Sequence, residues 1–260
     1  MSKLGDCIRK ALHTDSPPMG FAAANRGAAN PSLLVGVVFG SLSLDRAREA
    51  VLRGADTCLF AVSSPREGDL QEVLTVLGET PAGLLPRQAD RPSLDRLASL
   101  GTDYVAFAPD DVPASVLLHP RLGRVLVLEG DLSDAHLRTL EPMPLDALYL
   151  RWWKGPLTVR GQMELQRVAG FSHKPLMVPV PPRIEGPELE ALREAGVVLL
   201  AIDGDRGENL EALPALREAI GGLPARRHRR EERPEALLPP PQAVAAAVTE
   251  EEEGEEEEEL

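Results

Sequence analysis

Short aliphatic runs of strand length recur along the chain, and each is followed by a stretch with the spacing of an amphipathic helix. The runs begin 21 to 30 residues apart, close to the shortest distance that accommodates a strand, a crossover helix and two loops. They predict eight strands, at 33–38, 57–62, 82–85, 103–107, 124–128, 145–150, 175–180 and 197–202. The pattern therefore indicates eight consecutive βα units.

The segments between the predicted strands carry helix signals. Ser93 is expected to cap a helix over 94–100, and Gly101 stands where a glycine commonly ends one. The segment 110–118 is short and contains a proline, which predicts a short or irregular helix. After the eighth predicted strand, apolar residues repeat at helical spacing over 210–220, which predicts a single last helix.

Eight βα units favour an α/β fold, a compact (β/α)8 TIM-type barrel, over an open doubly wound sheet. Closure of the eight strands removes both edges that an open parallel sheet exposes. The open sheet is also typical of dinucleotide-binding proteins, whose first strand leads into a GxGxxG turn. Here the first strand leads into VVFGSLSLD, with Gly40 as its single glycine, and no GxxxxGKS or GxxxxGKT phosphate loop occurs.

Three parts follow from this interpretation, with the barrel over 32–222. Residues 1–31 form an N-terminal helix and a loose arm. The helix, over 3–12, has an apolar face that is expected to cover the N-terminal mouth of the barrel. Residues 223–260 lose the aliphatic periodicity and become rich in Arg, Pro and Glu, so we expect a disordered acidic C-terminal tail there.

Charge and apolar content narrow the classes of partner. The net charge is −13, but nine of the 41 acidic residues fall in the glutamate run at 250–259, and without that run the net charge is −4. The body is mildly acidic, so we expect no nucleic acid as a partner. No run of 18 uncharged apolar residues and no secretory signal occurs, so we expect no membrane segment. Cys7 and Cys58 stand far apart, and free thiols favour a cytoplasmic location.

Candidate functional residues follow from the fold, because the working groups of such barrels come from the carboxyl ends of the strands. Arg87, Glu129, Arg151 and Asp203 each continue the same alternate set of strand positions, and residues two apart on a strand face the same way. The other set on the sixth strand is aliphatic, as expected under covering helices. The four side chains are therefore predicted to face the barrel axis.

This set predicts a site for an anion with acid/base groups. The arginines Arg87, Arg151 and Arg183 would bind a carboxylate or phosphate through their guanidinium forks. Glu129 and Asp203 would transfer a proton or help to hold Mg²⁺. The alternative is that these charges pair with one another or are simply solvated.

Three further residues near this mouth are candidates. Lys154 is the one lysine near the carboxyl ends of the strands, and we include it with the catalytic groups. Arg206 follows the eighth strand, where a helix start with Gly204 and Gly207 could admit an anion. Trp153 is expected either to stack on a ligand or to pack beneath the helices.

Histidine and metal chemistry are disfavoured. No histidine follows a predicted strand, and His119 and His173 precede strands, at the opposite face. The cysteines lack a CxxC spacing, so no dedicated metal site is predicted.

Two hypotheses of function remain. The first is a small cytoplasmic barrel enzyme of lyase, aldolase or isomerase type that acts on an anionic small metabolite, with or without Mg²⁺. The second is a non-catalytic barrel that serves as a binding or assembly subunit, with the acidic tail contacting a protein partner. The first hypothesis would be favoured if the mouth is concave and the side chains of Glu129, Arg151 and Asp203 lie within contact distance of one another.

Overall fold

The structure is a computed structural model that describes residues 2–13, 31–86, 90–110, 112–154 and 156–224. The chain divides into two units, 1–226 and 227–260, and all described residues belong to the first. The predicted tail from residue 225 onward and most of the predicted arm lie outside the described residues.

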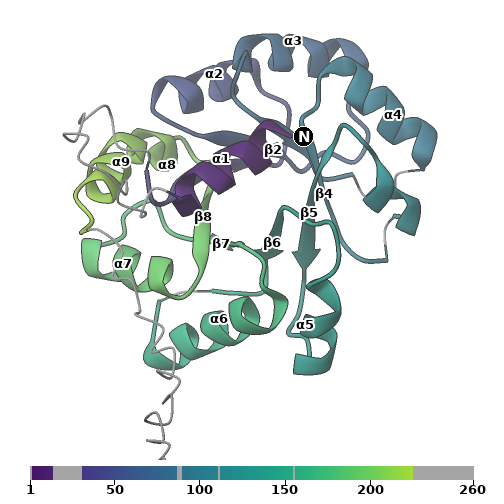
Figure 1. Cartoon of the computed structure of the whole chain (residues 1–260). Helices are drawn as coiled ribbons and strands as arrows, with labels where there is room; N and C mark the ends of the chain where they lie inside the picture. The colour runs from purple at the N-terminus through teal and green to yellow at the C-terminus, as the bar shows by residue number, and fades with distance from the viewer. Residues whose placement is uncertain (1, 14–30, 87–89, 111, 155, 225–260) are drawn as a thin grey trace, which may run out of the picture. The chain divides into compact units, whose positions relative to one another are not determined.

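Eight parallel strands form a closed barrel in which consecutive strands are neighbours (Figure 1). The strands are β1 Leu34–Phe39, β2 Thr57–Phe60, β3 Ala82–Leu84, β4 Tyr104–Phe107, β5 Gly123–Leu128, β6 Ala147–Leu150, β7 Leu176–Pro179 and β8 Val197–Asp203. Closure is made by β8 pairing with β1, in the register Leu34 to Leu199. The predicted barrel is confirmed, and the open sheet is excluded because β8 has no free edge.

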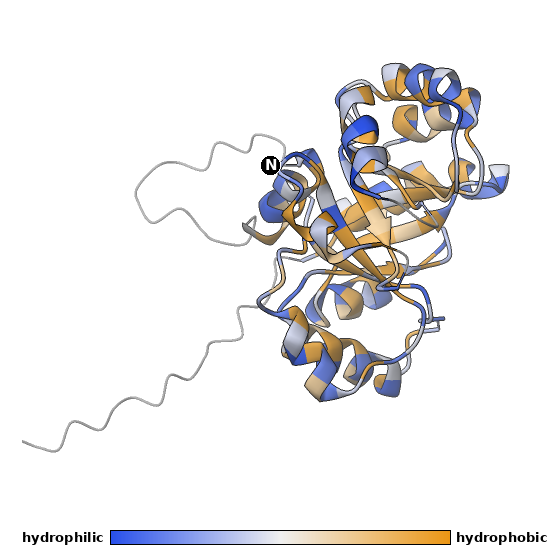
Figure 2. Ribbon diagram, turned by 90° about the vertical axis from the view of Figure 1, so that its right-hand side faces the viewer, coloured by the Kyte–Doolittle hydropathy of each residue, from blue (hydrophilic) through white to orange (hydrophobic). Residues whose placement is uncertain are grey.

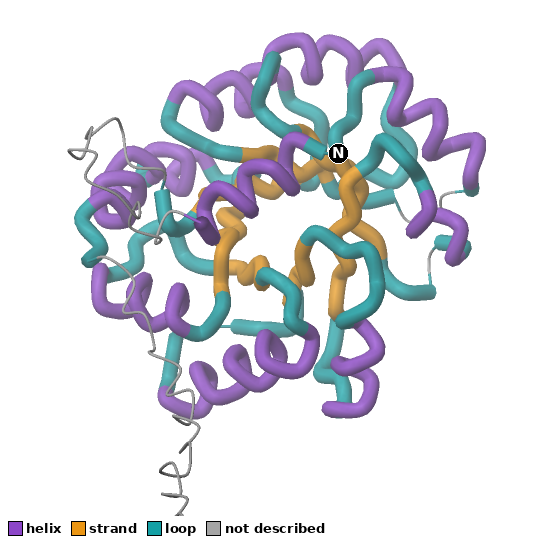
Figure 3. Tube along the Cα trace, in the orientation of Figure 1, coloured by secondary structure: helices purple, strands orange, loops and turns teal. Residues whose placement is uncertain are grey.

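Helices surround the strands, as the ring of purple segments around the orange ones shows (Figure 3). They are α1 Lys3–His13, α2 Leu44–Leu52, α3 Glu67–Leu77, α4 Arg91–Leu100, the 3-10 helix η1 Ala114–Leu118, α5 Asp134–Leu140, α6 Val159–Ser172, α7 Gly186–Glu194, α8 Gly207–Glu211 and α9 Leu213–Gly221. None of the helices in the described part of the chain has the length and apolar character needed to cross a bilayer.

Some helix details differ from the sequence-based expectation. The N-cap of α4 is Asp90, whose carboxylate accepts from the backbone N–H of Ser93, so Ser93 is not the cap. Gly101 does end α4, in the left-handed conformation with φ of 103°. The expected single last helix is two, α8 and α9. They meet at Ala212, because Pro214 lies in the first turn of α9 and cannot continue the preceding helix.

The strands separate two cores. The larger core lies between strands and helices and includes Leu84, Leu148 and Leu200. The smaller fills the barrel interior and includes Tyr104, Val127 and Tyr149. In Figure 2 the central strands are largely orange, whereas the surrounding helices carry blue positions as well.

Side chains fill the interior of the barrel at the level of Tyr104. Tyr104 is fully buried there, with its hydroxyl 3.0 Å from Oγ1 of Thr57 and 3.3 Å from the carbonyl oxygen of Cys58. Its ring lies over Gly83, where a Cβ would stand 2.2 Å from the ring atoms. A ligand therefore has no room at this level of the barrel.

The N-terminal mouth is closed by α1, which lies across the ring of strands (Figure 1). Leu4, Ile8 and Ala11 are buried against the interior core. The carboxylate of Asp103 accepts from the backbone N–H groups of Lys3 and Leu4 at 2.7 and 2.9 Å, which satisfies two amides in the first turn of α1. The predicted cover over this mouth is present, and the barrel interior lies beneath it.

Candidate functional site

The predicted strand parity, that is, the alternation of inward-facing and outward-facing side chains along a strand, holds at the open mouth. Val127 of β5, Tyr149 of β6 and Ala201 of β8 all belong to the interior core. Val127 also pairs with Tyr149 across the two strands. Glu129 and Arg151 each stand two residues further along, and this register brings them together at the mouth.

A cavity of about 330 Å³ opens at this mouth, within the usual size range of small-molecule sites. Its lining comes from the carboxyl ends of strands β2 to β6: Ala61, Ser63, Leu85, Pro86, Ala108, Val127, Glu129 and Arg151. Among the described lining residues, the charged ones are Glu129 and Arg151. The site is thus a small cup with a predominantly polar surface and one pair of opposite charges.

The two charges form an ion pair. Nη1 of Arg151 donates to Oε1 of Glu129 at 2.6 Å, and the side chains are 45% and 61% exposed. An exposed ion pair of this kind contributes only about 0.2–1 kcal/mol to stability. Stabilisation of the fold therefore does not explain why these two residues are paired. No other described group engages the guanidinium, so Nε and Nη2 remain available to a second anion.

Tyr149 stands two residues before Arg151 and pairs with Val127 of the cavity lining, although it does not line the cavity itself. The sequence pattern used it only to establish which strand positions face inward. Tyr149 is 7% exposed, and its hydroxyl has no hydrogen-bond partner among the described residues. Burial raises the pKa of Tyr149, the charges of Glu129 and Asp203 raise it further, and Arg151 opposes them. The hydroxyl therefore stays protonated at neutral pH and can donate a hydrogen bond. Its position two residues before Arg151, in the set of inward-facing positions, is the sequence feature from which it could have been identified.

Asp203 is held by its own loop instead of joining the Glu129–Arg151 pair. Its Oδ1 accepts from the backbone N–H of Asp205 at 3.0 Å, and its Oδ2 lies 3.6 Å from Nε of Arg206. Neither Asp203 nor Arg206 lines the mouth cavity. The expected mutual reach of Glu129, Arg151 and Asp203 is therefore met by only two of the three.

A carboxylate of the chain itself lies beside the anion site considered at the last loop. Oδ2 of Asp205 accepts from the backbone N–H of Gly40 at 2.8 Å, and Oδ1 lies 3.7 Å from Arg46. This carboxylate connects the loops after β8 and β1. A phosphate in the same place would meet a negative charge, so the mouth cavity is the better location for an anion.

The remaining predicted residues stand apart from the cavity. Trp153 is 5% exposed and packs in the outer core, so it does not line the mouth. Lys154 and Arg183 are exposed, and neither forms an ion pair with another residue that the structure describes. Arg87 lies outside the described residues.

The loop after Glu129 is anchored by Arg167 of α6, another residue that sequence reasoning missed. Its guanidinium contacts the carboxylates of Asp131, Asp134 and Glu164 and donates to the carbonyl of Leu132 at 3.1 Å. Hydrogen bonding to Asp134 is the largest effect that raises the pKa of Arg167. Arg167 thus holds the segment that begins two residues after Glu129.

No histidine among the described residues lines the mouth cavity. His119 is buried near the N-terminal end, where Nδ1 accepts from the backbone N–H of Leu122 at 3.1 Å and Nε2 lies 3.0 Å from Asp95. Within the described ranges, no group of three or more His, Cys, Asp or Glu side chains could hold a metal ion. We therefore derive no reaction step through Mg²⁺.

A larger, mostly apolar cavity of about 480 Å³ lies on the outside of the barrel, between η1 and α5. It includes Leu117, Leu126, Leu140 and Met143 in its lining. The fourth βα unit has only the short η1 in place of a full helix, which leaves the outer side of β5 less covered. Its lining reaches the last residues of β4 and β5, Phe107 and Leu128, on the helix-facing side of the strands, whereas the charge pair lies on the inward side.

Comparison with known proteins shows the fold. No known protein family matches the sequence, and no curated protein matches it significantly. Solved structures do match, 718 chains in all. The likeness therefore lies in the three-dimensional arrangement.

Three of these structures illustrate it. Thiamine phosphate pyrophosphorylase from Pyrococcus furiosus is 17% identical, with 73% of this chain and 96% of that chain covered and a TM-score of 0.56. HpcH/HpaI aldolase from Desulfitobacterium hafniense is 13% identical, with coverage of 75% and 95% and a TM-score of 0.53. Tryptophan synthase from Mycobacterium tuberculosis is 15% identical, with coverage of 85% and 97% and a TM-score of 0.58. At these identities the likeness establishes the (β/α)8 barrel.

Proposed function

We propose that this chain is a (β/α)8-barrel enzyme of lyase, aldolase or isomerase type that acts on a small anionic metabolite. The observation that carries the proposal is the mouth cavity with Glu129 and Arg151 as its charged lining residues. Its position supports the proposal, because active sites of this fold lie at the carboxyl ends of the strands. The names of similar solved structures, which include an aldolase and a synthase, support an enzyme as well.

Arg151 is the anion-binding residue of this proposal. With Nη1 engaged by Glu129, its Nε and Nη2 present two parallel donors to a carboxylate or phosphate. Binding there places the anionic group beside Glu129. Leu85, Ala108 and Val127 supply apolar surface for the uncharged part of the ligand.

Glu129 acts as the proton-transfer group. Its carboxylate removes a proton from the carbon next to the carbonyl group of the substrate, and the electron pair of that C–H bond moves to form an enolate. The Tyr149 hydroxyl, protonated and without another described partner, donates a hydrogen bond to the negative oxygen that develops. In an isomerase Glu129 returns the proton to a different carbon, and in a lyase the electron pair expels a leaving group.

Asp203 and Lys154 remain candidate catalytic groups, and Arg87, Arg183 and Arg206 remain candidate binding residues, whereas the buried Trp153 does not. Glu129 and Arg151 are tested first, because they line the mouth cavity. We further propose that the protein acts in the cytoplasm, with a small anionic ligand and without nucleic acid or membrane as partners.

A non-catalytic barrel is the second candidate, and one observation favours it. Glu129 and Arg151 neutralise each other, and no lysine or histidine among the described residues lines the mouth beside them. In that case the cavity is a structural cup, and function lies with a protein partner of the acidic tail.

A ligand screen separates the two candidates. Small carboxylates and phosphate esters, with and without Mg²⁺, are added and the melting temperature is measured, since a ligand that binds the native state raises stability by RT ln(1 + [L]/Kd). We expect at least one anion to stabilise the wild type and to have no effect on Arg151→Ala. Arg53→Ala is the matched control, because Arg53 pairs with Glu49 on the exposed side of α2.

Glu129→Gln should abolish turnover of a substrate found in this way but retain its binding. If no anion stabilises the wild type, or if Arg151→Ala is stabilised equally, the enzyme proposal fails. Loss of a bound protein partner on removal of residues 250–259 would then support the second candidate.

A further inference from the structure

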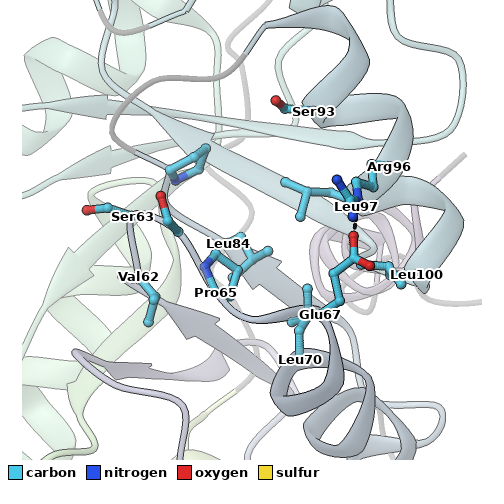
Figure 4. Close-up of a pocket in the computed structure, with 12 residues that line it drawn as sticks. Val62, Ser63, Pro65, Glu67, Leu70, Leu84, Ser93, Arg96, Leu97 and Leu100 are labelled. Atoms are coloured by element: carbon cyan, nitrogen blue, oxygen red, sulfur yellow. Dashed lines mark ion pairs between the residues drawn. The ribbon is translucent and has the colours of Figure 1, made fainter.

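A second pocket, of about 340 Å³, lies beside the mouth cavity, between α3 and α4 (Figure 4). Four leucines from three elements make its apolar wall: Leu70, Leu84, Leu97 and Leu100. Serine hydroxyls from Ser63, Ser64 and Ser93 stand around it. It therefore offers apolar surface with a polar rim, the composition of a site for an organic group.

The pocket and the mouth cavity are neighbours that share part of their lining. Ser63 and Pro86 line both. In Figure 4 the Ser63 hydroxyl points away from Leu84 and Leu97, so this residue presents one side to each space. No charged residue described in either lining stands at this shared boundary, so an apolar group can pass between the two without leaving a charge unpaired.

The far side of the pocket is closed by an ion pair. Glu67 at the start of α3 contacts Arg96 of α4, as the dashed line in Figure 4 shows. Both charges are satisfied by each other, so neither calls for a charged ligand group. This leaves the anion-binding role to Arg151, in the mouth.

We propose that the leucine-lined pocket is a second subsite of the mouth, and that it receives an apolar group carried by the anionic substrate. This inference rests on the proposed function. The substrate class is then an amphiphilic anion: a carboxylate or phosphate ester whose charged end binds Arg151 and whose alkyl chain or phenyl ring passes Ser63 and Pro86 to reach Leu84 and Leu97. Short, fully polar anions occupy only the mouth.

The test compares ligands of increasing apolar size. Acetate, butanoate, hexanoate and 3-phenylpropanoate are titrated against the protein by calorimetry, with phosphate and phenyl phosphate as a second pair. We expect hexanoate to bind at least tenfold more tightly than acetate, since each methylene that is fully buried tightens binding by roughly fourfold.

Two serine variants locate the effect. Ser64 is exposed at the pocket rim, so Ser64→Phe fills the pocket without changing the buried core. We expect it to reduce the ratio of hexanoate to acetate affinity to about one or two. Ser99→Phe adds the same ring to an exposed position of α4 that does not line the pocket, and this control should keep the wild-type ratio.

Each outcome bears on one claim. If acetate binds and requires Arg151, but chain length has no effect or its effect survives Ser64→Phe, the second subsite is wrong and the proposed function stands. If hexanoate binds through the pocket in Arg151→Ala as well as in the wild type, the pocket is separate from the mouth and the inference is overturned. If no anion of any length binds, the proposed function itself fails.

Discussion

Gly83→Ala is expected to destabilise the barrel strongly, because the interior has no space for one extra methyl group. The added Cβ would stand 2.2 Å from Cε2 and Cζ of Tyr104, which is fully buried. The ring must move, and overpacking of this kind costs about 1–3 kcal/mol. Displacing the hydroxyl from Thr57 and Cys58 adds about 1 kcal/mol for a lost buried hydrogen bond. We expect a loss of about 2–4 kcal/mol in the free energy of unfolding.

Thermal and urea unfolding measure this loss. For a domain of this size about 2–4 °C corresponds to each kcal/mol, so the melting temperature should fall by roughly 5–15 °C. Gly170→Ala is the control, because Gly170 lies inside α6 and nothing stands within 4 Å of the position that its new methyl group would take. That change should stabilise the protein by about 0.5–1 kcal/mol, since alanine favours the helix over glycine.

A double-mutant cycle identifies the cause. Tyr104→Leu removes the ring atoms that the new methyl group meets, so Gly83→Ala should cost about 1–3 kcal/mol less in that background. A melting temperature within about 2 °C of the wild type for Gly83→Ala alone would refute the reasoning. So would simple additivity with Tyr104→Leu, because the methyl group and the ring could not then be in contact.

Three further predictions concern other parts of the chain. Burial raises the pKa of the Cys58 thiol to about 12, so the folded state resists ionisation while the unfolded thiol loses its proton near its ordinary value. The thiol therefore leaves the free energy of unfolding unchanged below about pH 9 and lowers it by about 1.4 kcal/mol per pH unit as the pH rises toward 12, and Cys58→Ala should show a pH slope smaller by this amount in urea titrations. Asp103→Ala should cost about 0.5–2 kcal/mol, measured by urea unfolding, because it removes the acceptor of two amides at the start of α1; an unchanged midpoint would contradict this. Removal of residues 227–260 should leave the melting temperature nearly unchanged, since that segment lacks the aliphatic periodicity of the barrel; a large drop would show that it packs on the barrel.

The barrel could be predicted from the sequence because its information is local and repeated. Each strand is a short aliphatic run, and each following segment has helical spacing, so eight weak signals reinforce one another. The division of the last helix at Ala212 was missed, because the apolar spacing continues through the break and only Pro214 marks it.

The candidate site could be predicted only as far as the strands remain regular. Parity correctly places Glu129 and Arg151 at one mouth, since β5 and β6 pair in register up to Leu128 and Leu150. Parity fails for Trp153, because the chain turns directly after β6 and the backbone N–H of Trp153 bonds to the carbonyl of Leu150. The alternation of side chains stops there, and Trp153 packs in the outer core.

The sequence pattern could not predict which charged loop residues pair with one another. Asp203 follows the strand parity, yet Asp205 and Arg206, two and three residues away, hold it within its own loop. Short contour distance favours such local pairs over a partner across the barrel. Arg167 illustrates the opposite case, since it gathers Asp131 and Asp134 from more than 30 residues away.

The central claim is that a small anion binds at Arg151 in the mouth of the barrel, and an NMR titration tests it most directly. The amide signals of the protein are followed while a small carboxylate is added. We expect saturable shifts at Ala61, Ala108 and Val127, which line the cavity, and their loss in Arg151→Ala. Shifts that instead centre on Leu117 and Leu140, beside the outer apolar cavity, or an unchanged titration of Arg151→Ala, would contradict the claim.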